Sequence, residues 1–570
     1  MSASGTPTIG TRLKNGMLEL MGLNLKPDPT IPRPRGLRRF FPKAPAVPEG
    51  YHSGTLYRDV IALAWPALIE LILTQLTSMA DMMMVGGLGP WAITSVGLTT
   101  QPKFLLMTMI MSLNVGTTAL VARFRGAGDQ KAANDVFRQA LSLTLVVSTI
   151  AAVLGYVFAR PMVAFMGAQE PATLDGGTVY LRVQMIGFVP IALTSTITAA
   201  MRGAGFSRQA MYYNTASNVV NILLNYLLIE GHWGFPRLEL FGASLATSIG
   251  QCVAFLIAFA IVLSKRYYIK LQRGDSFKPN FSLIRRIARV GMPALLEQGF
   301  MRAGMITFAK TVAGLGTVAF ATHNICMNIQ AMSFMTCTAF STAATSLVGQ
   351  SLGKKNPQLA ECYCSRARRL GQITAVALMI AFVTLGREIV GLYNDEPEIV
   401  EQGSRILLML VAMLPLQSSQ FITAGALRGA GDTRFPAFVS FITVFLIRPG
   451  LTILLIHYTD LGLYGAWIAL IADQLLRLGP HLLLPSLGVG ALRGRGNPIA
   501  QRRQIHPRRT RHLQFPRRQA VHQRPGTRRI RRIQRAARLG QRREHRVALL
   551  PLLLKEPLGL GQFPADLAAE

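Results

Sequence analysis

Half of the 570 residues are apolar, only 15% are charged and the mean hydropathy is +0.33, a balance that excludes a soluble globular protein of this length. The apolar residues form runs of about 20 or more, enough to cross a hydrocarbon core of about 30 Å, which predicts an all-α polytopic membrane protein. The net charge of +33 requires no nucleic acid, because about half of it lies in a C-terminal tail and the surplus elsewhere lies in an N-terminal arm and in alternate loops.

The chain opens with a segment, residues 1–56, that is rich in Pro, Gly and basic residues. No secretory signal is recognisable in it. We expect a disordered basic cytoplasmic arm, whose partner, if it has one, is anionic membrane lipid.

Twelve apolar runs follow, six in each half of the chain. They cover residues 59–84, 95–121, 137–159, 178–200, 210–230 and 241–264, then 285–311, 318–347, 368–385, 402–425, 436–457 and 462–485. We expect 12 transmembrane helices, arranged as an N-terminal six-helix bundle over 57–264, a cytoplasmic linker over 265–284 and a C-terminal six-helix bundle over 285–485.

The second half of the chain repeats the first. Residues 66–70 (PALIE) return as 293–297 (PALLE), and the same shift of 227 residues carries Val85–Gly89 onto Val312–Gly316. A repeat of this length is a duplicated bundle and not a solenoid unit. Because each copy has an even number of spans, both copies run in the same direction, which predicts two pseudo-symmetric bundles around a shared pathway.

Lys and Arg are concentrated in the arm and in every second loop, while the loops between them are nearly uncharged or acidic. The positive-inside rule places the basic loops and both termini in the cytoplasm. We therefore expect a multi-pass protein of the inner (plasma) membrane.

Ionisable residues within a span are costly and are candidates for an ion pathway. Glu70 and Asp81 lie eleven residues apart on the first span, within about 20° of the same helix face. Glu297 is the repeat partner of Glu70, whereas Phe308 takes the place of Asp81. We take Asp81, Glu297 and Glu70 as candidate ion-coupling residues; helix packing is the alternative for both glutamates, and a local ion pair with Arg302 is another for Glu297.

Polar amides in the fifth span are candidates for a substrate pathway. Asn214, Asn218 and Asn225 fall on one helix face, with Asn221 close to it. They either join helices through hydrogen bonds or line a polar cavity beside Asp81. The repeat partners Gln101 and Asn328 are candidates for the same pathway.

The last span carries Asp473 and Arg477, whose spacing predicts a structural ion pair on one helix face. The five cysteines are expected to be free thiols without a metal site. No GxxxxGK[ST], HExxH or GxSxG motif occurs. We therefore expect neither an enzyme nor an ATP-driven pump, and no cofactor apart from transported H⁺ or Na⁺.

The tail, residues 486–570, has an unusual composition: from Arg493 onward, 19 Arg and one Lys stand against four acids. It shows no hydrophobic period, which predicts disorder. It is either a solvated tail, an extension that binds nucleic acid or lipid, or, by our own hypothesis, a segment translated out of frame from some point after Arg477.

Several stretches, in order and at their spacing, resemble the multidrug and toxic compound extrusion (MATE) family. They include residues 80–89 (ADMMMVGGLG), 318–323 (VAFATH), 427–433 (LRGAGDT) and 465–468 (GAWI), and the likeness covers about 57 to 478. The resemblance implies a secondary antiporter that expels small-molecule organic cations, driven by inward H⁺ or Na⁺. It also implies that Asp81 matches a usual coupling acid near the end of the first span, and that Glu297 lies in a span where many members carry a functional acid.

Under this interpretation we expect a monomer that has no nucleic-acid partner. Two other functions remain open. A lipid-linked precursor flippase would need a strongly cationic central cavity, whereas the mid-span charges identified here are mainly acidic. A membrane-anchored nucleic-acid binder would act through the tail.

Overall fold

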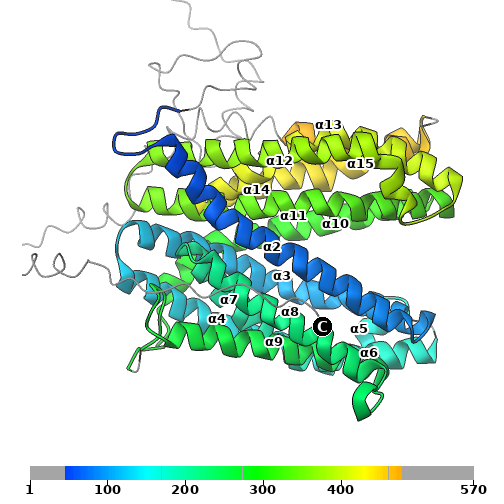
Figure 1. Ribbon diagram of the computed structural model, residues 1–570, viewed down its shortest axis with the longest axis horizontal. Coiled ribbons are helices and arrows are strands. Elements are labelled where there is room, and N and C mark those ends of the chain that lie inside the picture. The colour runs from blue at the N-terminus through cyan, green and yellow to red at the C-terminus, as the bar shows by residue number, and fades with distance from the viewer. Residues whose placement is uncertain (1–44, 169, 273, 460, 478–570) are drawn as a thin grey trace, which may run out of the picture. The chain divides into compact units, whose positions relative to one another are not determined.

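The computed structural model describes residues 45–168, 170–272, 274–459 and 461–477 (Figure 1). The first bundle consists of α2 (Ser53–Gly86), α3 (Pro90–Gly126), α4 (Gln130–Val157) with the short α5 (Ala159–Phe165), α6 (Pro171–Ile186) with α7 (Phe188–Gly203), α8 (Ser207–Ile229) and α9 (Glu239–Leu263). A single 3₁₀ turn, η2 (His232–Gly234), precedes α9.

The second bundle consists of α10 (Phe281–Ala313), α11 (Thr317–Gly353), α12 (Pro357–Gly391), α13 (Pro397–Ala430), the span formed by α14 (Arg434–Ser440), η3 (Phe441–Ile447) and α15 (Arg448–His457), and a last helix over 462–477. The predicted all-α architecture of twelve spans in two six-helix bundles is confirmed. The predicted end of the last span, 478–485, lies outside the described residues, as do 1–44 of the arm and all of the tail.

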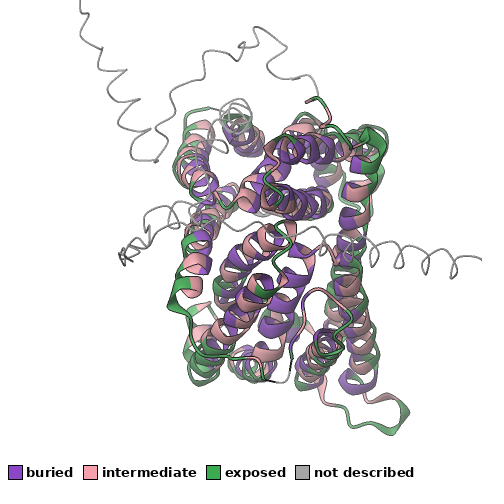
Figure 2. Ribbon diagram, turned by 90° about the vertical axis from the view of Figure 1, so that its left-hand side faces the viewer, coloured by how far each residue is buried: buried purple, intermediate pink, exposed green. Residues whose placement is uncertain are grey.

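Eight of the described helices are long and apolar enough to cross a membrane, and the pair α6–α7, bent by 48°, makes a ninth such span. The helices α8 and α10 fall short by this measure because they carry asparagines and basic residues, respectively. Buried residues line the faces that neighbouring helices turn toward one another (Figure 2). Many large apolar side chains are exposed on the other faces, among them Leu105, Leu256, Ile306 and Ile373. Such a surface suits a lipid environment.

Two long helices belong to both bundles. The first turns of α2 pack against α11, α12 and α13, where Leu56, Val60 and Ala64 join one buried apolar cluster, while the later part of α2 packs on α8. Figure 1 shows α2 crossing between the two groups of helices. The repeat partner of Val60, Ile287 of α10, is buried in the core of the first bundle. The two helices are therefore exchanged symmetrically.

The bundles meet closely on the side that carries the basic loops, called here the basic side. A methyl group on Gly126 of α3 would lie 1.8 Å from the carbonyl oxygen of Gln350, and one on Gly353 of α11 would lie 2.1 Å from that of Arg123. The two glycines are repeat partners, as are Gln350 and Arg123. Only glycine permits this backbone approach, so the contact between α3 and α11 obeys the two-fold symmetry.

The last residues before α2 are packed on the second bundle. Pro45 and Ala46 accept hydrogen bonds through their carbonyl oxygens from Arg366 and Cys362 of α12. Helix α2 begins at Ser53, four residues before the predicted start of the first bundle. All five cysteines are free, as predicted.

Candidate functional site

A ladder of polar contacts joins α2 to α8. Asn214 donates to Glu70 at 2.7 Å, Asn218 to Thr74 at 3.3 Å and Asn225 to Asp81 at 2.5 Å. The ladder forms because both helices present polar residues at the same spacing, so each rung joins residues 144 positions apart. The predicted faces of the first and fifth spans therefore lie against each other.

Asp81 accepts from a second amide as well. With the side-chain amide of Asn221 oriented to satisfy its neighbours, its nitrogen donates to Asp81 Oδ1 at 2.9 Å and its oxygen accepts from the Thr247 hydroxyl at 3.2 Å. Asn225 is fully buried, and its own Oδ1 has no hydrogen-bond partner among the described residues. Two amide donors thus hold a carboxylate, with a free acceptor oxygen beside it.

Lys103 of α3 is the residue of this cluster that the sequence interpretation missed. Its Nζ donates to Gln184 Oε1 of α6 at 2.5 Å, and its ammonium interacts electrostatically with Asp81. The sequence contained the signal, because Lys103 is an ionisable residue within the predicted second span. The other two candidates, exposed Gln101 and half-buried Asn328, form no hydrogen bond with this cluster in the part of the chain that is described.

Glu70 and Glu297 form equivalent ion pairs in the two bundles. Glu70 pairs with Arg202 of α7 at 2.6 Å, and Glu297 pairs with Arg428 of α13 at 2.6 Å. The arginines belong to the repeated RGAG stretches, so each pair is a copy of the other. Both glutamates are buried. These contacts match the helix-packing alternative; the proposed role of the two glutamates in ion coupling stays a prediction.

The expected ion pair between Glu297 and Arg302 is wrong. The guanidinium of Arg302 instead lies over the ring of Phe104 in α3, 3.6 Å from the ring centroid. The local spacing on α10 was misleading, because α10 lies between both bundles and Arg302 points to the first one. Among the described residues no carboxylate lies within ion-pair distance of Arg302.

The predicted pair of Asp473 and Arg477 is confirmed, with hydrogen bonds of 3.0 and 2.8 Å. Arg448, at the start of α15, also binds Asp473 from the neighbouring span and was missed. All three side chains are buried. The guanidinium of Arg448 lies 6.0 Å from the ring of Phe308, the repeat partner of Asp81. The second bundle therefore has an aromatic ring beside an arginine where the first bundle has a carboxylate.

The expectation that the mid-span charges are mainly acidic is also wrong. Four acids lie within the spans, but six basic residues accompany them: Lys103, Arg202, Arg302, Arg428, Arg448 and Arg477. Three of the acids, Glu70, Glu297 and Asp473, are matched by arginines at ion-pair distance. Asp81 is the acid that carboxamides hold, with a lysine as its charged neighbour.

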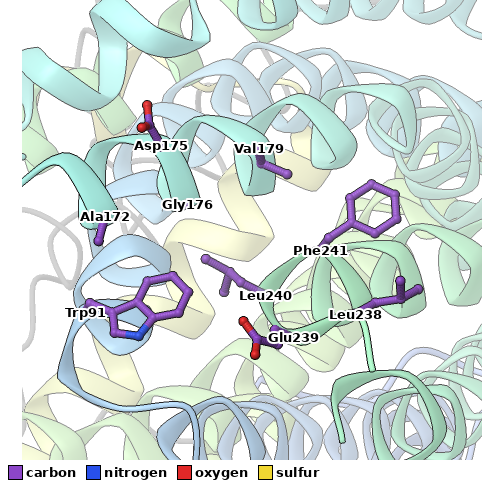
Figure 3. Close-up of a pocket in the computed structure, with 9 residues that line it drawn as sticks. All are labelled: Trp91, Ala172, Asp175, Gly176, Val179, Leu238, Glu239, Leu240 and Phe241. Carbon is purple, nitrogen blue, oxygen red and sulfur yellow. The ribbon is translucent and has the colours of Figure 1, made fainter. Parts of the chain in front are cut away.

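A separate hollow of about 340 Å³ lies at the ends of α3, α6 and α9 away from the basic side. In Figure 3 the indole of Trp91 and the side chain of Leu240 extend into it between the two helices. Its carboxylates are already matched, since Asp175 pairs with Arg160 at 2.6 Å and Glu239 with Arg237 at 3.4 Å. The hollow is mainly apolar and shares no residue with the Asp81 cluster.

Comparison with known proteins gives consistent matches. The family model MatE matches twice, over residues 66–227 and 293–454. A relative from Thermotoga maritima, described as probable multidrug resistance protein NorM, is 29% identical over 452 residues, which are 78% of this chain and 94% of the relative. The uncharacterized transporter YisQ of Bacillus subtilis is 26% identical over 419 residues, 74% of this chain and 92% of its own.

Solved structures show the same fold. An outward-facing multidrug resistance MATE family transporter of the MOP superfamily superimposes with a TM-score of 0.71 at 23% identity, over 77% of this chain and 96% of its own. A MOP superfamily transporter from Pyrococcus furiosus, described as having a binding pocket of reverse polarity that suggests a different function, gives a TM-score of 0.72 at 23% identity, over 77% and 97%. The twelve-helix arrangement accounts for nearly the whole of each of these proteins.

Proposed function

Because the chain belongs to the multidrug and toxic compound extrusion (MATE) family of transporters, we propose that it is a secondary antiporter that exports organic cations in exchange for H⁺ or Na⁺. The coupling residue in this proposal is Asp81. The main support is the environment of Asp81, which differs from that of every other mid-span acid: carboxamides, and no arginine, hold its carboxylate.

An arginine at ion-pair distance would keep a carboxylate permanently charged and occupied. Amide donors orient the carboxylate without neutralising it, so it keeps an affinity for a cation or a proton. A charged Asp81 attracts an organic cation or Na⁺, whereas a proton that arrives from outside removes the charge and releases the substrate. The membrane potential assists inward movement of the coupling ion by about 2.3 kcal/mol per charge per 100 mV.

Lys103 sets the range over which this exchange works. Its ammonium lies near enough to Asp81 to favour the charged carboxylate, which prevents burial alone from keeping the acid protonated. The hydrogen bond to Gln184 holds this ammonium in place. An incoming cation therefore enters against a weak repulsion from Lys103, which helps it to leave again once Asp81 is protonated.

The test compares Asp81→Asn with the wild type in proteoliposomes that contain an ethidium-type cation. Proton and sodium gradients are imposed separately. We expect a loss of gradient-driven transport in the variant because Asn carries no exchangeable charge. Asp175→Asn is the matched control, since Asp175 is an exposed carboxylate outside the cluster. Normal coupled transport by Asp81→Asn would refute the assignment, and the gradient that drives the wild type identifies the ion.

A further inference from the structure

Arg302 is the exception among the mid-span arginines. Arg202, Arg428, Arg448 and Arg477 each lie at ion-pair distance from a carboxylate, whereas among the described residues Arg302 has none. It lies within α10, eleven residues from the end of that helix. A cation at this depth is costly unless it faces protein or water and finds an acceptor.

The contact with Phe104 satisfies one part of the guanidinium and leaves another part open. A guanidinium is planar, and stacking on an aromatic ring uses its face. Its five N–H donors point outward along its edge. Since no hydrogen bond to Arg302 occurs within the described residues, this edge is available for a planar acceptor. A carboxylate is the group that matches the fork of N–H donors, through two parallel hydrogen bonds.

The position of the pair connects it to the Asp81 cluster. Phe104 follows Lys103 directly in α3 of the first bundle, and Arg302 comes from α10, which continues into the second bundle. Arg302 is only half-buried, so part of its side chain is accessible. A negative site at Asp81 and a positive site at Arg302 therefore adjoin the same turn of α3. This arrangement suits a molecule that carries both charges.

We propose that Arg302 and Phe104 form a subsite for an aromatic carboxylate, and that the transported compounds include aromatic zwitterions. The carboxylate binds the edge of Arg302, the adjoining ring packs beside Phe104, and the cationic group binds at Asp81. The proposal rests on the proposed export of organic cations and adds a second recognition element to it. Neither the cationic group nor its site changes.

The test uses rhodamine B, which carries a carboxylate and a delocalised cation, and its ethyl ester, which keeps the cation alone. Binding to the purified full-length protein in detergent is followed by fluorescence anisotropy. Arg302→Gln should weaken binding of the acid about ten-fold and leave the ester within about two-fold. Arg302→Lys should retain part of the preference, because a lysine binds a carboxylate through a single point charge.

Arg125→Gln provides a matched control. Arg125 forms the same kind of contact, 4.0 Å from the centroid of the Tyr268 ring, but on the basic side outside the spans, and we expect it to affect neither dye. Unchanged acid binding by a folded Arg302→Gln variant, or an equal loss for both dyes, would overturn the subsite and leave cation export standing. Wild-type protein that binds neither dye would overturn both proposals.

Discussion

Each mid-span carboxylate is defined by what neutralises it. Glu70 and Glu297 are each matched by an arginine from the fourth span of the same bundle, and Asp473 by two arginines. A buried ion pair adds little net stability, but the loss of one partner leaves the other charge uncompensated. The three sites therefore hold helices in register, and Asp81 remains as the acid whose charge is free to change.

This difference predicts the effect of breaking a pair. Glu297→Gln leaves Arg428 buried beside a neutral amide and should destabilise the protein by roughly 3–5 kcal/mol. The double variant Glu297→Gln/Arg428→Gln should lose less, because it removes both charges. Thermal unfolding in detergent measures both variants.

The control for that comparison is Glu401→Gln. Its pair with Arg405 is exposed, so the expected change is about 0–1 kcal/mol. A double variant that is less stable than either single variant would contradict the view that each pair persists because its charges offset each other.

The candidate site was partly predictable because its main elements follow helix periodicity. The shared face of Glu70 and Asp81 and the row of asparagines on the fifth span required only the spacing of residues. The pairing of Glu297 with Arg428 joins residues 131 positions apart, and local spacing favoured Arg302 instead. Arg448 and Lys103 were missed because their partners come from other spans, which no spacing along one helix reveals.

At the scale of elements, the contact between α3 and α11 determines how closely the bundles approach. It relies on glycines where a side chain would collide with a backbone carbonyl. Hydrogen bonds across the bundles add to it: Ser346 donates to the carbonyl of Arg202 at 2.7 Å, and Gln350 donates to that of Gly203 at 3.0 Å. We infer that this contact seals the basic side when the pathway opens to the opposite side.

A methyl group at this contact should therefore be harmful. Gly126→Ala places a carbon 1.8 Å from the Gln350 oxygen, which forces the helices apart and should cost roughly 1–3 kcal/mol. Gly97→Ala in the same helix meets no atom within 4 Å and should be neutral or slightly stabilising. Unfolding temperature and cation transport in proteoliposomes report both effects, and equal behaviour of the two variants would contradict a tight seal.

Helix positions were well predicted and helix lengths were not. Apolar runs mark the part of a helix inside the hydrocarbon, whereas α3 and α11 extend beyond it to 37 residues each. The bend between α6 and α7 was missed for a similar reason. Gly187 lies at the break, and a methyl group there would approach the side chain of Ser248 to 2.7 Å. The close contact with α9 is a tertiary feature that hydropathy does not register.

At the scale of the whole molecule, the family match ends well before the end of the chain. The relatives are covered almost completely by about three quarters of this sequence. The twelve helices therefore account for what the family shares, and the Arg-rich tail is additional.

Removal of residues 493–570 should accordingly leave drug resistance unchanged in cells that express equal amounts of protein. RNA binding by purified protein, compared before and after the deletion, tests the nucleic-acid alternative. A tail that is required for resistance would contradict the assignment of transport to the helical region alone. Mass spectrometry of the C-terminal peptides tests the separate hypothesis of a frameshift.

The exchange of α2 and α10 between the bundles has a consequence for how such a chain can arise and fold. Each six-helix half lacks the partner that covers the first turns of its own leading helix, so a half expressed alone would expose the apolar face of Leu56, Val60 and Ala64. The arrangement is that of a domain-swapped dimer joined into one chain. We expect the separate halves to be recovered as folded protein only when they are co-expressed.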